Sequence, residues 1–350
     1  MRKVKIIVWG IGEVGRGLIR LAAAREWVEV VGGICRHYPD PKDAAKVMAG
    51  KDLGELAGLG KKLGVTALDS PDEIFHHMKA DIVFVATSSP YDEADEQVLK
   101  AIQSGSNVIS LSDPRLIYPW IHWPELARRI DGAAKEKGVT VLETGISPGF
   151  TFDFVPAVFT GICARVRDIT VTEVGDLAPF RDGILDWLGV GISPEEFKRR
   201  LAQGKTRWAV FQTSPEMDLI AAAVGFDLDE TQLEIRPLTS RKFKKSAFGL
   251  PIPAGIVCGI RQVFKGVKDG RTAIVMDRIW TVDPEADELE QGLRVSIEGE
   301  PSLEVSLKGE VLKKGDVATY AHAFNAIPQV MEAKPGLLSV KDLPPATPLR

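Results

Sequence analysis

The sequence predicts an α/β protein: a doubly wound parallel sheet in the first half, followed by a second, α+β domain of mostly antiparallel sheet. Before residue 145, short apolar runs alternate with amphipathic helical stretches, as in a parallel sheet that helices cover on both faces. After residue 146, apolar and polar residues alternate along the strands, as in antiparallel sheets. The chain has 350 residues, 45% of them hydrophobic and 26% charged, which is enough for two globular domains.

In the first half, six short apolar runs rich in β-branched residues predict six strands. The predicted strands cover residues 4–9, 28–34, 65–68, 81–86, 107–111 and 139–143. Between these runs lie amphipathic patterns that predict helices, so that strand and helix alternate along the chain. The clearest helical patterns cover residues 14–24, 92–104 and 123–137. These elements define a first domain over residues 1–145.

The second half combines alternating strand patterns with a few helices. Predicted strands cover residues 167–174, 255–264, 272–282 and 293–298. A capping box at Ser193, with Pro194 at the first helical position, predicts a helix that ends near residue 201. Further helices are expected over 213–224 and 318–333, and the Pro-rich tail 335–350 is expected to lie along the surface. The second domain is therefore expected over residues 146–317.

Composition argues against several classes of protein. A net charge of −4 provides no general basic surface for nucleic acid or an anionic membrane. The apolar runs are far shorter than the ~20 residues of a membrane span. The N-terminus enters its first strand directly, which argues against a cleaved signal peptide. Three widely spaced cysteines indicate reduced thiols and a cytoplasmic protein, and the five histidines are too scattered to predict a metal site.

A glycine-rich loop directly after the first strand predicts a dinucleotide site of the Rossmann type. Its pattern is G-x-G-x-x-G, and it opens the first predicted helix, which is the context that gives this pattern its meaning. The first glycine permits the tight turn, the second lets the backbone approach a pyrophosphate, and the third lets the helix pack closely on the strand. The helix N-terminus then faces the phosphates with its N–H groups. The loop consists of Gly10, Ile11, Gly12, Glu13, Val14 and Gly15.

The residues after the second strand predict a preference for NADP(H), with NAD(H) also possible. Sites selective for NAD have Asp or Glu there, about 20 residues past the glycines. This chain has Arg36 and His37 instead, and an arginine can bind a 2′-phosphate in a forked geometry. The alternative is that Arg36 is simply a solvated loop residue.

Small, hydroxylated and acidic residues follow the later strands, at the edge of the sheet where ligands bind in open α/β folds. Thr87 and Ser88 after the fourth strand and Ser112 after the fifth are expected to lie along the cofactor. Asp113 is the candidate catalytic acid at the nicotinamide end, although an aspartate before proline also serves as a turn or helix cap. Residues expected to line the substrate pocket are Tyr118, Trp120, Ser147 and Phe150.

These residues resemble the 2,4-diaminopentanoate dehydrogenases and the related NAD(P)H-dependent amine dehydrogenases, distant relatives of dihydrodipicolinate reductase. The resemblance covers nearly the whole chain, through motifs in a shared order and spacing. The motifs lie at residues 10–15, 52–58, 107–120, 144–150, 189–197, 298–301, 318–319, 325–328, 335–337 and 342–344.

The resemblance implies reversible conversion of an amine to a ketone and ammonia through an imine. It also implies a homodimer, and a C-terminal helix and tail (318–350) that pack back on the first domain. In the family, a glutamate after the fifth strand lies beside the imine and handles ammonia or its proton. Asp113 falls at that place. Its side chain is one methylene shorter than that of glutamate, and Pro114 and Arg115 after it resemble a local insertion. The loop and C-terminal motifs imply cofactor contacts at Ser147, where the family has asparagine, and at Pro148 and Asn325.

Three functional classes fit these residues. The first is an amine dehydrogenase, in which a carboxylate stabilises a cationic imine and accepts a proton. The second is a reductase of another imine or carbonyl compound, which would turn over without ammonia. The third is a dinucleotide-binding protein without turnover. In each class the partner is a small molecule, and no nucleic acid or membrane is expected.

Overall fold

The computed structural model describes residues 2–38, 46–88, 90–206 and 214–348, in two compact units. Unit 1 comprises Met1–Phe150 and Asp316–Arg350, and unit 2 comprises Thr151–Gly315. The first unit therefore extends five residues beyond the boundary predicted at 145. It also contains the C-terminal segment of the chain.

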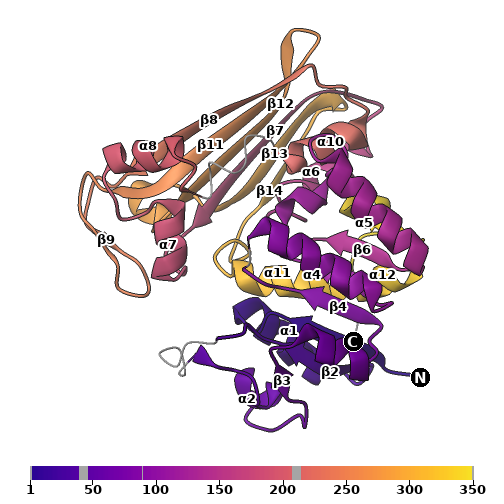
Figure 1. The fold of residues 1–350 in the computed structure, drawn as a ribbon. Helices are drawn as coiled ribbons and strands as arrows, with labels where there is room; N and C mark the ends of the chain where they lie inside the picture. The colour runs from indigo at the N-terminus through magenta and orange to yellow at the C-terminus, as the bar shows by residue number, and fades with distance from the viewer. Residues whose placement is uncertain (1, 39–45, 89, 207–213, 349–350) are drawn as a thin grey trace. The chain divides into compact units, whose positions relative to one another are not determined.

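Unit 1 is built on a seven-stranded parallel sheet, and this confirms the predicted fold class (Figure 1). The strand order is β15-β6-β5-β4-β1-β2-β3. The order reverses between β4 and β1, and in folds of this kind ligands bind outside the carboxyl ends of the strands at such a point. The strands are β1 (Val4–Trp9), β2 (Val28–Ile34), β3 (Ala67–Leu68), β4 (Ile82–Val85), β5 (Asn107–Ser110), β6 (Thr140–Glu143) and β15 (Gly336–Leu338).

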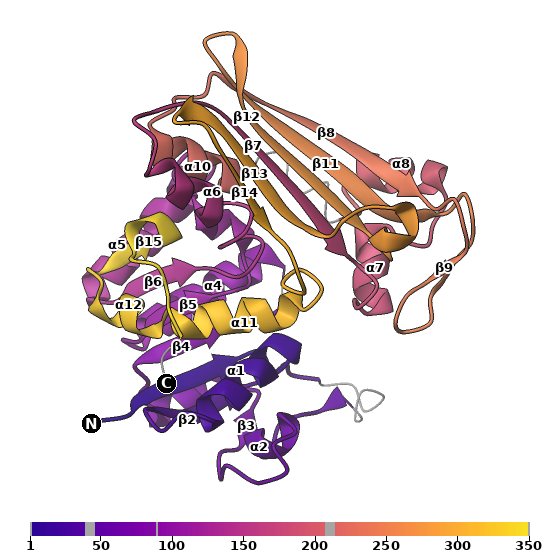
Figure 2. The ribbon, with the colours of Figure 1, turned by 180° about the vertical axis from the view of Figure 1, so that it is seen from behind.

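Helices cover both faces of this sheet, since its strands are apolar on both sides and all four residues of β4 are fully buried. Figures 1 and 2 show α4 (Tyr91–Gln103) and α5 (Pro124–Lys137) on one face. The other face carries α1 (Glu13–Ala23), α11 (Gly315–Asn325) and α12 (Ile327–Glu332). Shorter helices in this unit are α2 (Leu53–Leu56), α3 (Pro71–His77), η2 (Pro114–Ile117) and η4 (Val340–Asp342).

The C-terminal segment differs from the prediction in two ways. The single helix expected over 318–333 is divided into α11 and α12 at Ala326, where Pro328 supplies no N–H for a continuous helical ladder. The tail does not simply lie along the surface, because Gly336–Leu338 pairs in parallel with β6 as an edge strand, and Leu337 is buried. A three-residue strand is too short to produce a periodic pattern in the sequence.

Unit 2 is built on a six-stranded sheet in the order β14-β13-β7-β12-β11-β8. Every neighbouring pair is antiparallel except β7 and β12, which run parallel, so the prediction of a mostly antiparallel sheet is confirmed. The strands are β7 (Arg165–Asp176), β8 (Glu230–Thr239), β11 (Val257–Lys268), β12 (Arg271–Thr281), β13 (Gly292–Glu300) and β14 (Leu303–Leu307). The sequence prediction missed β8 and β14, the two edge strands, in which exposed residues alternate with only half-buried ones.

Two helices of unit 2 correspond to helices that the sequence predicts. In α8 (Pro194–Ala202), the Ser193 hydroxyl accepts a hydrogen bond from the Glu196 N–H at 3.2 Å, which is the predicted cap. The helix expected over 213–224 is α10 (Pro215–Val224), and residue 213 lies outside the described residues. The other elements are α6 (Phe154–Thr160), α7 (Asp182–Leu188), η3 (Pro284–Asp287) and a two-stranded sheet of β9 (Lys244–Lys245) and β10 (Pro251–Ile252).

Candidate functional site

The glycine loop between β1 and α1 packs closely at two of its three glycines and is open at the third. Gly10 adopts a φ of +106°, and a Cβ there would overlap the Ala86 carbonyl at the end of β4. A Cβ on Gly15 would overlap the Gly10 carbonyl, so α1 can pack this close only with glycine. At Gly12, by contrast, a Cβ would meet nothing within 4 Å. The backbone at Gly12 therefore faces open space at the start of α1, where a phosphate group fits.

The other loop residues differ in how buried their side chains are. Ile11 is buried, Val14 is half-buried, and Glu13 points its carboxylate towards Arg16 at 3.8 Å. Gly12 is the N-cap of α1 and has no side chain to accept from the first-turn N–H groups, so an anion can take that place.

The carboxyl end of β2 lies beside that of β3 and brings together residues that are distant in the sequence. Arg36 and His37 are both exposed, as a site for a 2′-phosphate requires. His37 Nδ1 lies 2.6 Å from a carboxylate oxygen of Asp69, which directly follows β3. An acidic residue is therefore present at this edge, although none follows β2 itself. Sequence reasoning missed Asp69 because it considered only the end of the second strand.

The ends of β4 and β5 are joined by Ser112. Its hydroxyl donates to the Val85 carbonyl at 3.0 Å and accepts from the Thr87 N–H at 2.8 Å. The Thr87 hydroxyl in turn donates to Gln97 Oε1 on α4 at 2.6 Å, whereas Ser88 is exposed. The structure therefore brings Thr87 and Ser112 together, with their hydroxyl groups holding the sheet edge in shape.

Asp113 is fully buried and forms a salt bridge. Arg115 Nη2 donates to Asp113 Oδ2 at 2.7 Å, and Arg115 Nε lies 3.0 Å from both carboxylate oxygens. Asp113 Oδ1 also accepts from the Arg115 N–H and caps η2. The capping role that the sequence left open is thus what the structure shows. A catalytic role for Asp113 stays a prediction, and it requires the carboxylate to become accessible to a substrate.

Two further acids complete a buried cluster around this ion pair. Arg115 Nη2 also donates to Asp95 Oδ2 on α4 at 2.8 Å. Burial, together with the nearby Asp113 carboxylate, raises the pKa of Asp95 to about 7. At the end of β6, Glu143 Oε1 accepts from the Asp113 N–H at 3.2 Å, and burial raises the pKa of Glu143 well above its usual value. The cluster therefore joins two buried acids with raised pKa values to the Asp113–Arg115 ion pair.

The loop that follows β6 is fastened to the C-terminal helix α11 inside unit 1. The Thr144 hydroxyl lies 3.0 Å from His322 Nδ1, and the Phe150 ring packs against the His322 ring with centroids 4.9 Å apart. Burial lowers the pKa of His322 to about 4, so its imidazole is neutral at physiological pH. Sequence reasoning missed His322, although its spacing from Asn325 places it one turn earlier on the same helix.

The remaining predicted residues differ in how buried they are. Ser147 and Pro148, within this loop, and Asn325, at the end of α11, are all half-buried. Tyr118 is half-buried, with Lys341 Nζ 5.9 Å from its ring centroid, whereas Trp120 is 38% exposed. Half-buried and exposed side chains of this kind remain accessible to a ligand.

Unit 2 buries a second charged cluster that the sequence did not indicate. The Glu173 carboxylate on β7 accepts from the Thr151 hydroxyl at 2.8 Å and from the Trp280 indole N–H at 3.0 Å. Arg278 on β12 donates to Glu216 at 3.0 Å and stacks 4.2 Å from the Phe152 ring centroid. These contacts hold Thr151 and Phe152, the first residues of unit 2, against the sheet.

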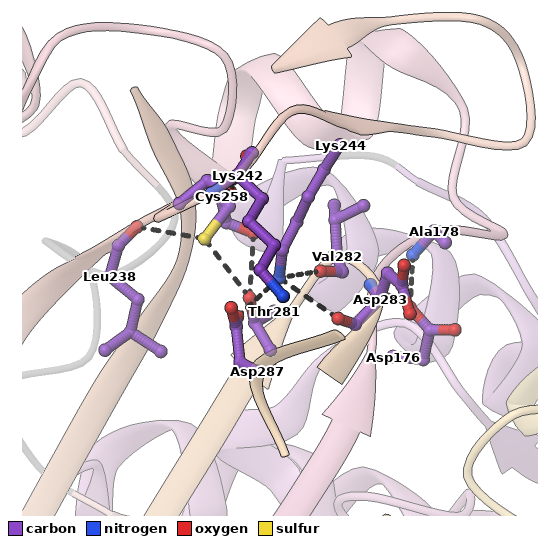
Figure 3. A network of polar contacts seen from close by, with 11 residues as sticks. Asp176, Ala178, Leu238, Lys242, Lys244, Cys258, Thr281, Val282, Asp283 and Asp287 are labelled. Carbon is purple, nitrogen blue, oxygen red and sulfur yellow. Dashed lines mark hydrogen bonds and ion pairs between the residues drawn. The ribbon is translucent and has the colours of Figure 1, made fainter. Parts of the chain in front are cut away.

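A third polar network surrounds Lys244 in unit 2 (Figure 3). The Lys244 side chain is only 1% exposed. Its ammonium group donates to the Val282 carbonyl at 2.7 Å and the Asp283 carbonyl at 3.0 Å, and it pairs with Asp287. This network fixes the turn between β12 and η3 and has no feature of a ligand site.

Within the described residues, no helix combines the length and apolarity needed to cross a membrane. In the same part of the chain, no group of three or more His, Cys, Asp and Glu side chains is arranged to hold a metal ion.

Comparisons with known proteins identify the family of this chain. Residues 150–349 match the model of the 2,4-diaminopentanoate dehydrogenase C-terminal domain. The chain is 31% identical to 2,4-diaminopentanoate dehydrogenase of Acetoanaerobium sticklandii, over 98% of this chain and 94% of that protein. It is 28% identical to an amine dehydrogenase of Streptomyces virginiae, over 97% and 96% of the two chains.

Among solved structures, the amine dehydrogenase from Mycobacterium smegmatis has the same fold. It superposes with a TM-score of 0.83 at 24% sequence identity, covering 99% of this chain and 97% of that one.

Proposed function

The chain is an oxidoreductase that belongs to the 2,4-diaminopentanoate dehydrogenase family, and on that premise we propose that it is an amine dehydrogenase dependent on NADP(H). In the oxidative direction, an amine loses a hydride and a proton to become an imine, and water then converts the imine to a ketone and ammonia. The nicotinamide supplies the hydride acceptor. The observation that carries the proposal is the open backbone at Gly12 beside the closely packed Gly10 and Gly15.

The protein's own contribution is to bind, orient and handle the proton. We propose that the Gly10–Gly15 loop holds the diphosphate and that Thr87 and Ser112 shape the edge next to the nicotinamide. The half-buried Ser147, Pro148 and Asn325 would approach the cofactor, and Tyr118, Trp120 and Phe150 would form apolar pocket walls. Asp113 remains the proposed acid–base group. Its cluster supports this role, because a neighbouring acid with a pKa of about 7 can exchange protons at neutral pH.

NADP(H) is the proposed cofactor because Arg36 is exposed at the end of β2, where a 2′-phosphate is bound in this fold.

A homodimer is also proposed. One face of the six-stranded sheet packs on α6 and α10, and the opposite face carries the half-buried Val263, Val275 and Ile279 among exposed charges. We expect Ile279→Glu to convert a dimer into a monomer in light scattering. A wild-type mass of one chain would contradict the proposal.

The activity is tested by following NADPH and NADH oxidation over a panel of ketones and aldehydes, each with and without ammonium at alkaline pH. In the reverse direction, 2,4-diaminopentanoate is the first amine to test, because of the name of the relative. Turnover that depends on ammonium supports an amine dehydrogenase. Turnover without ammonium would instead identify a reductase of another carbonyl or imine, and cofactor binding without turnover would identify a binding protein.

A further inference from the structure

The ends of β2 and β3 form one surface next to the glycine loop. The Gly10 N–H donates to the Ile34 carbonyl at 2.8 Å, so the last residue of β2 touches the start of the loop. On its other side β2 pairs with β3, with Ile34 opposite Leu68, and the Cys35 N–H donates to the Leu68 carbonyl at 2.8 Å. Arg36, His37 and Asp69 therefore emerge at the same edge. In this fold the adenosine ribose of a dinucleotide lies at that edge.

Asp69 is an acid at this edge whose charge is engaged by a neighbour. One carboxylate oxygen lies 2.6 Å from His37 Nδ1, and the Asp69 side chain is 35% exposed. Its charge also acts on the end of β2, since burial and the nearby Asp69 carboxylate together raise the pKa of the Cys35 thiol. A carboxylate here has two opposite effects on cofactors: it accepts a hydrogen bond from a ribose 2′-hydroxyl, and it repels a 2′-phosphate.

We propose that Asp69 determines cofactor choice together with His37, an inference that rests on the proposed use of a nicotinamide dinucleotide. The His37 ring covers the Asp69 carboxylate and reduces its repulsion of a 2′-phosphate, while Arg36 binds that phosphate. The preference for NADPH over NADH thus depends on a contact between β2 and β3 as well as on Arg36. Removing His37 uncovers the acid and shifts the preference towards NADH. Removing the Asp69 charge shifts it further towards NADPH.

The test is direct binding of NADPH and NADH, measured by nicotinamide fluorescence with the full-length protein. We expect His37→Ala to lower the NADPH-to-NADH affinity ratio about fivefold and Asp69→Asn to raise it about threefold. Interactions between partly exposed charges have effects of this size. Arg36→Ala should weaken NADPH about tenfold and leave NADH nearly unchanged, because it removes a charge-assisted contact. Competition experiments with adenosine 2′,5′-bisphosphate and with AMP test the adenosine end of the site alone. The ratio of their two affinities should change in the same direction as the NADPH-to-NADH ratio in each variant.

Two variants make the result specific. In the His37→Ala/Asp69→Asn double variant, the decrease in the NADPH-to-NADH affinity ratio caused by His37→Ala should disappear, because no acid remains to be uncovered. Asp72→Asn is the matched control. Asp72 lies three residues after Asp69, is exposed and pairs with Lys100, so its substitution should leave the ratio unchanged. If wild type binds both dinucleotides but Asp69→Asn and His37→Ala leave their ratio unchanged, the role of Asp69 is overturned and the proposed function stands. If wild type binds neither, both are overturned.

Discussion

Arg115 Nη2 lies 2.7 Å from Asp113 Oδ2 and, on the same nitrogen, 2.8 Å from Asp95 Oδ2. One guanidinium nitrogen thus contacts two buried carboxylates, of which only Asp113 was expected to take part in the chemistry. This shared contact makes it possible to separate a catalytic role for Asp113 from a structural one.

We expect Asp113→Asn to lower kcat at least about a hundredfold if Asp113 transfers the proton, because general acid–base groups contribute that much or more. Asp95→Asn removes the second buried carboxylate from Arg115 and leaves Asp113 in place, so it should lower kcat far less than Asp113→Asn does. Steady-state kinetics with a reactive ketone and ammonium measures both. Equal losses in the two variants, with equal losses of thermal stability, would show that Asp113 acts only through its ion pair.

Asp95 should also make the protein less stable as the pH rises. Its folded-state pKa is raised to about 7 from 3.8, so between these values the folded protein holds a proton that the unfolded chain has released. The free energy of unfolding therefore falls across that window and levels off above it. Asp95→Asn, which imitates the protonated acid, should show a smaller decrease in Tm from pH 4.5 to pH 8. The exposed Asp72→Asn should keep the wild-type decrease, and an identical decrease in Asp95→Asn would refute this assignment.

Lys244→Met should destabilise the protein by roughly 3 kcal/mol, because it removes a buried ammonium group that contacts a carboxylate and two backbone carbonyl groups. The affected groups are the Val282 and Asp283 carbonyls and the Asp287 carboxylate (Figure 3). Lys245→Met, at the exposed next residue, is the matched control and should change stability by less than about 0.5 kcal/mol. Urea denaturation of the two variants gives the comparison. Similar midpoints for both would contradict the role assigned to Lys244.

Gly12 and Gly15 should respond differently to alanine. A Cβ at Gly12 meets no atom within 4 Å, so Gly12→Ala should fold with a nearly unchanged Tm. It should nevertheless bind NADPH at least about tenfold more weakly, since the methyl group occupies the space of the phosphate. Gly15→Ala should lower the Tm, because its Cβ would overlap the Gly10 carbonyl. Unimpaired binding by Gly12→Ala would place the dinucleotide elsewhere.

Much of the fold could be predicted because it depends on local sequence. Continuous apolar runs predicted six of the seven strands of the first sheet, and their alternation with helices predicted that the strands are parallel. The cap at Ser193 and the glycine loop are local as well, since turn and cap geometry involve only neighbouring residues. The fold class and the family are both confirmed. The edge strands β8 and β14 were missed because their exposed residues alternate with half-buried ones and not with fully buried apolar ones. The strand β15 was missed because it has only three residues.

The sequence by itself determined the type of sheet, the glycine loop, the family and the residue types available along the carboxyl edge. Tertiary structure alone decided how those residues are used. It paired Asp113 with Arg115, placed Asp69 against His37, brought His322 to Thr144 and buried Lys244 among carbonyl groups. The physical reason is that charge, burial and pKa depend on neighbours that the fold brings within a few ångströms. Except for Asp113 and Arg115, those neighbours lie tens of residues or more apart in the chain, where no periodicity or local motif links them.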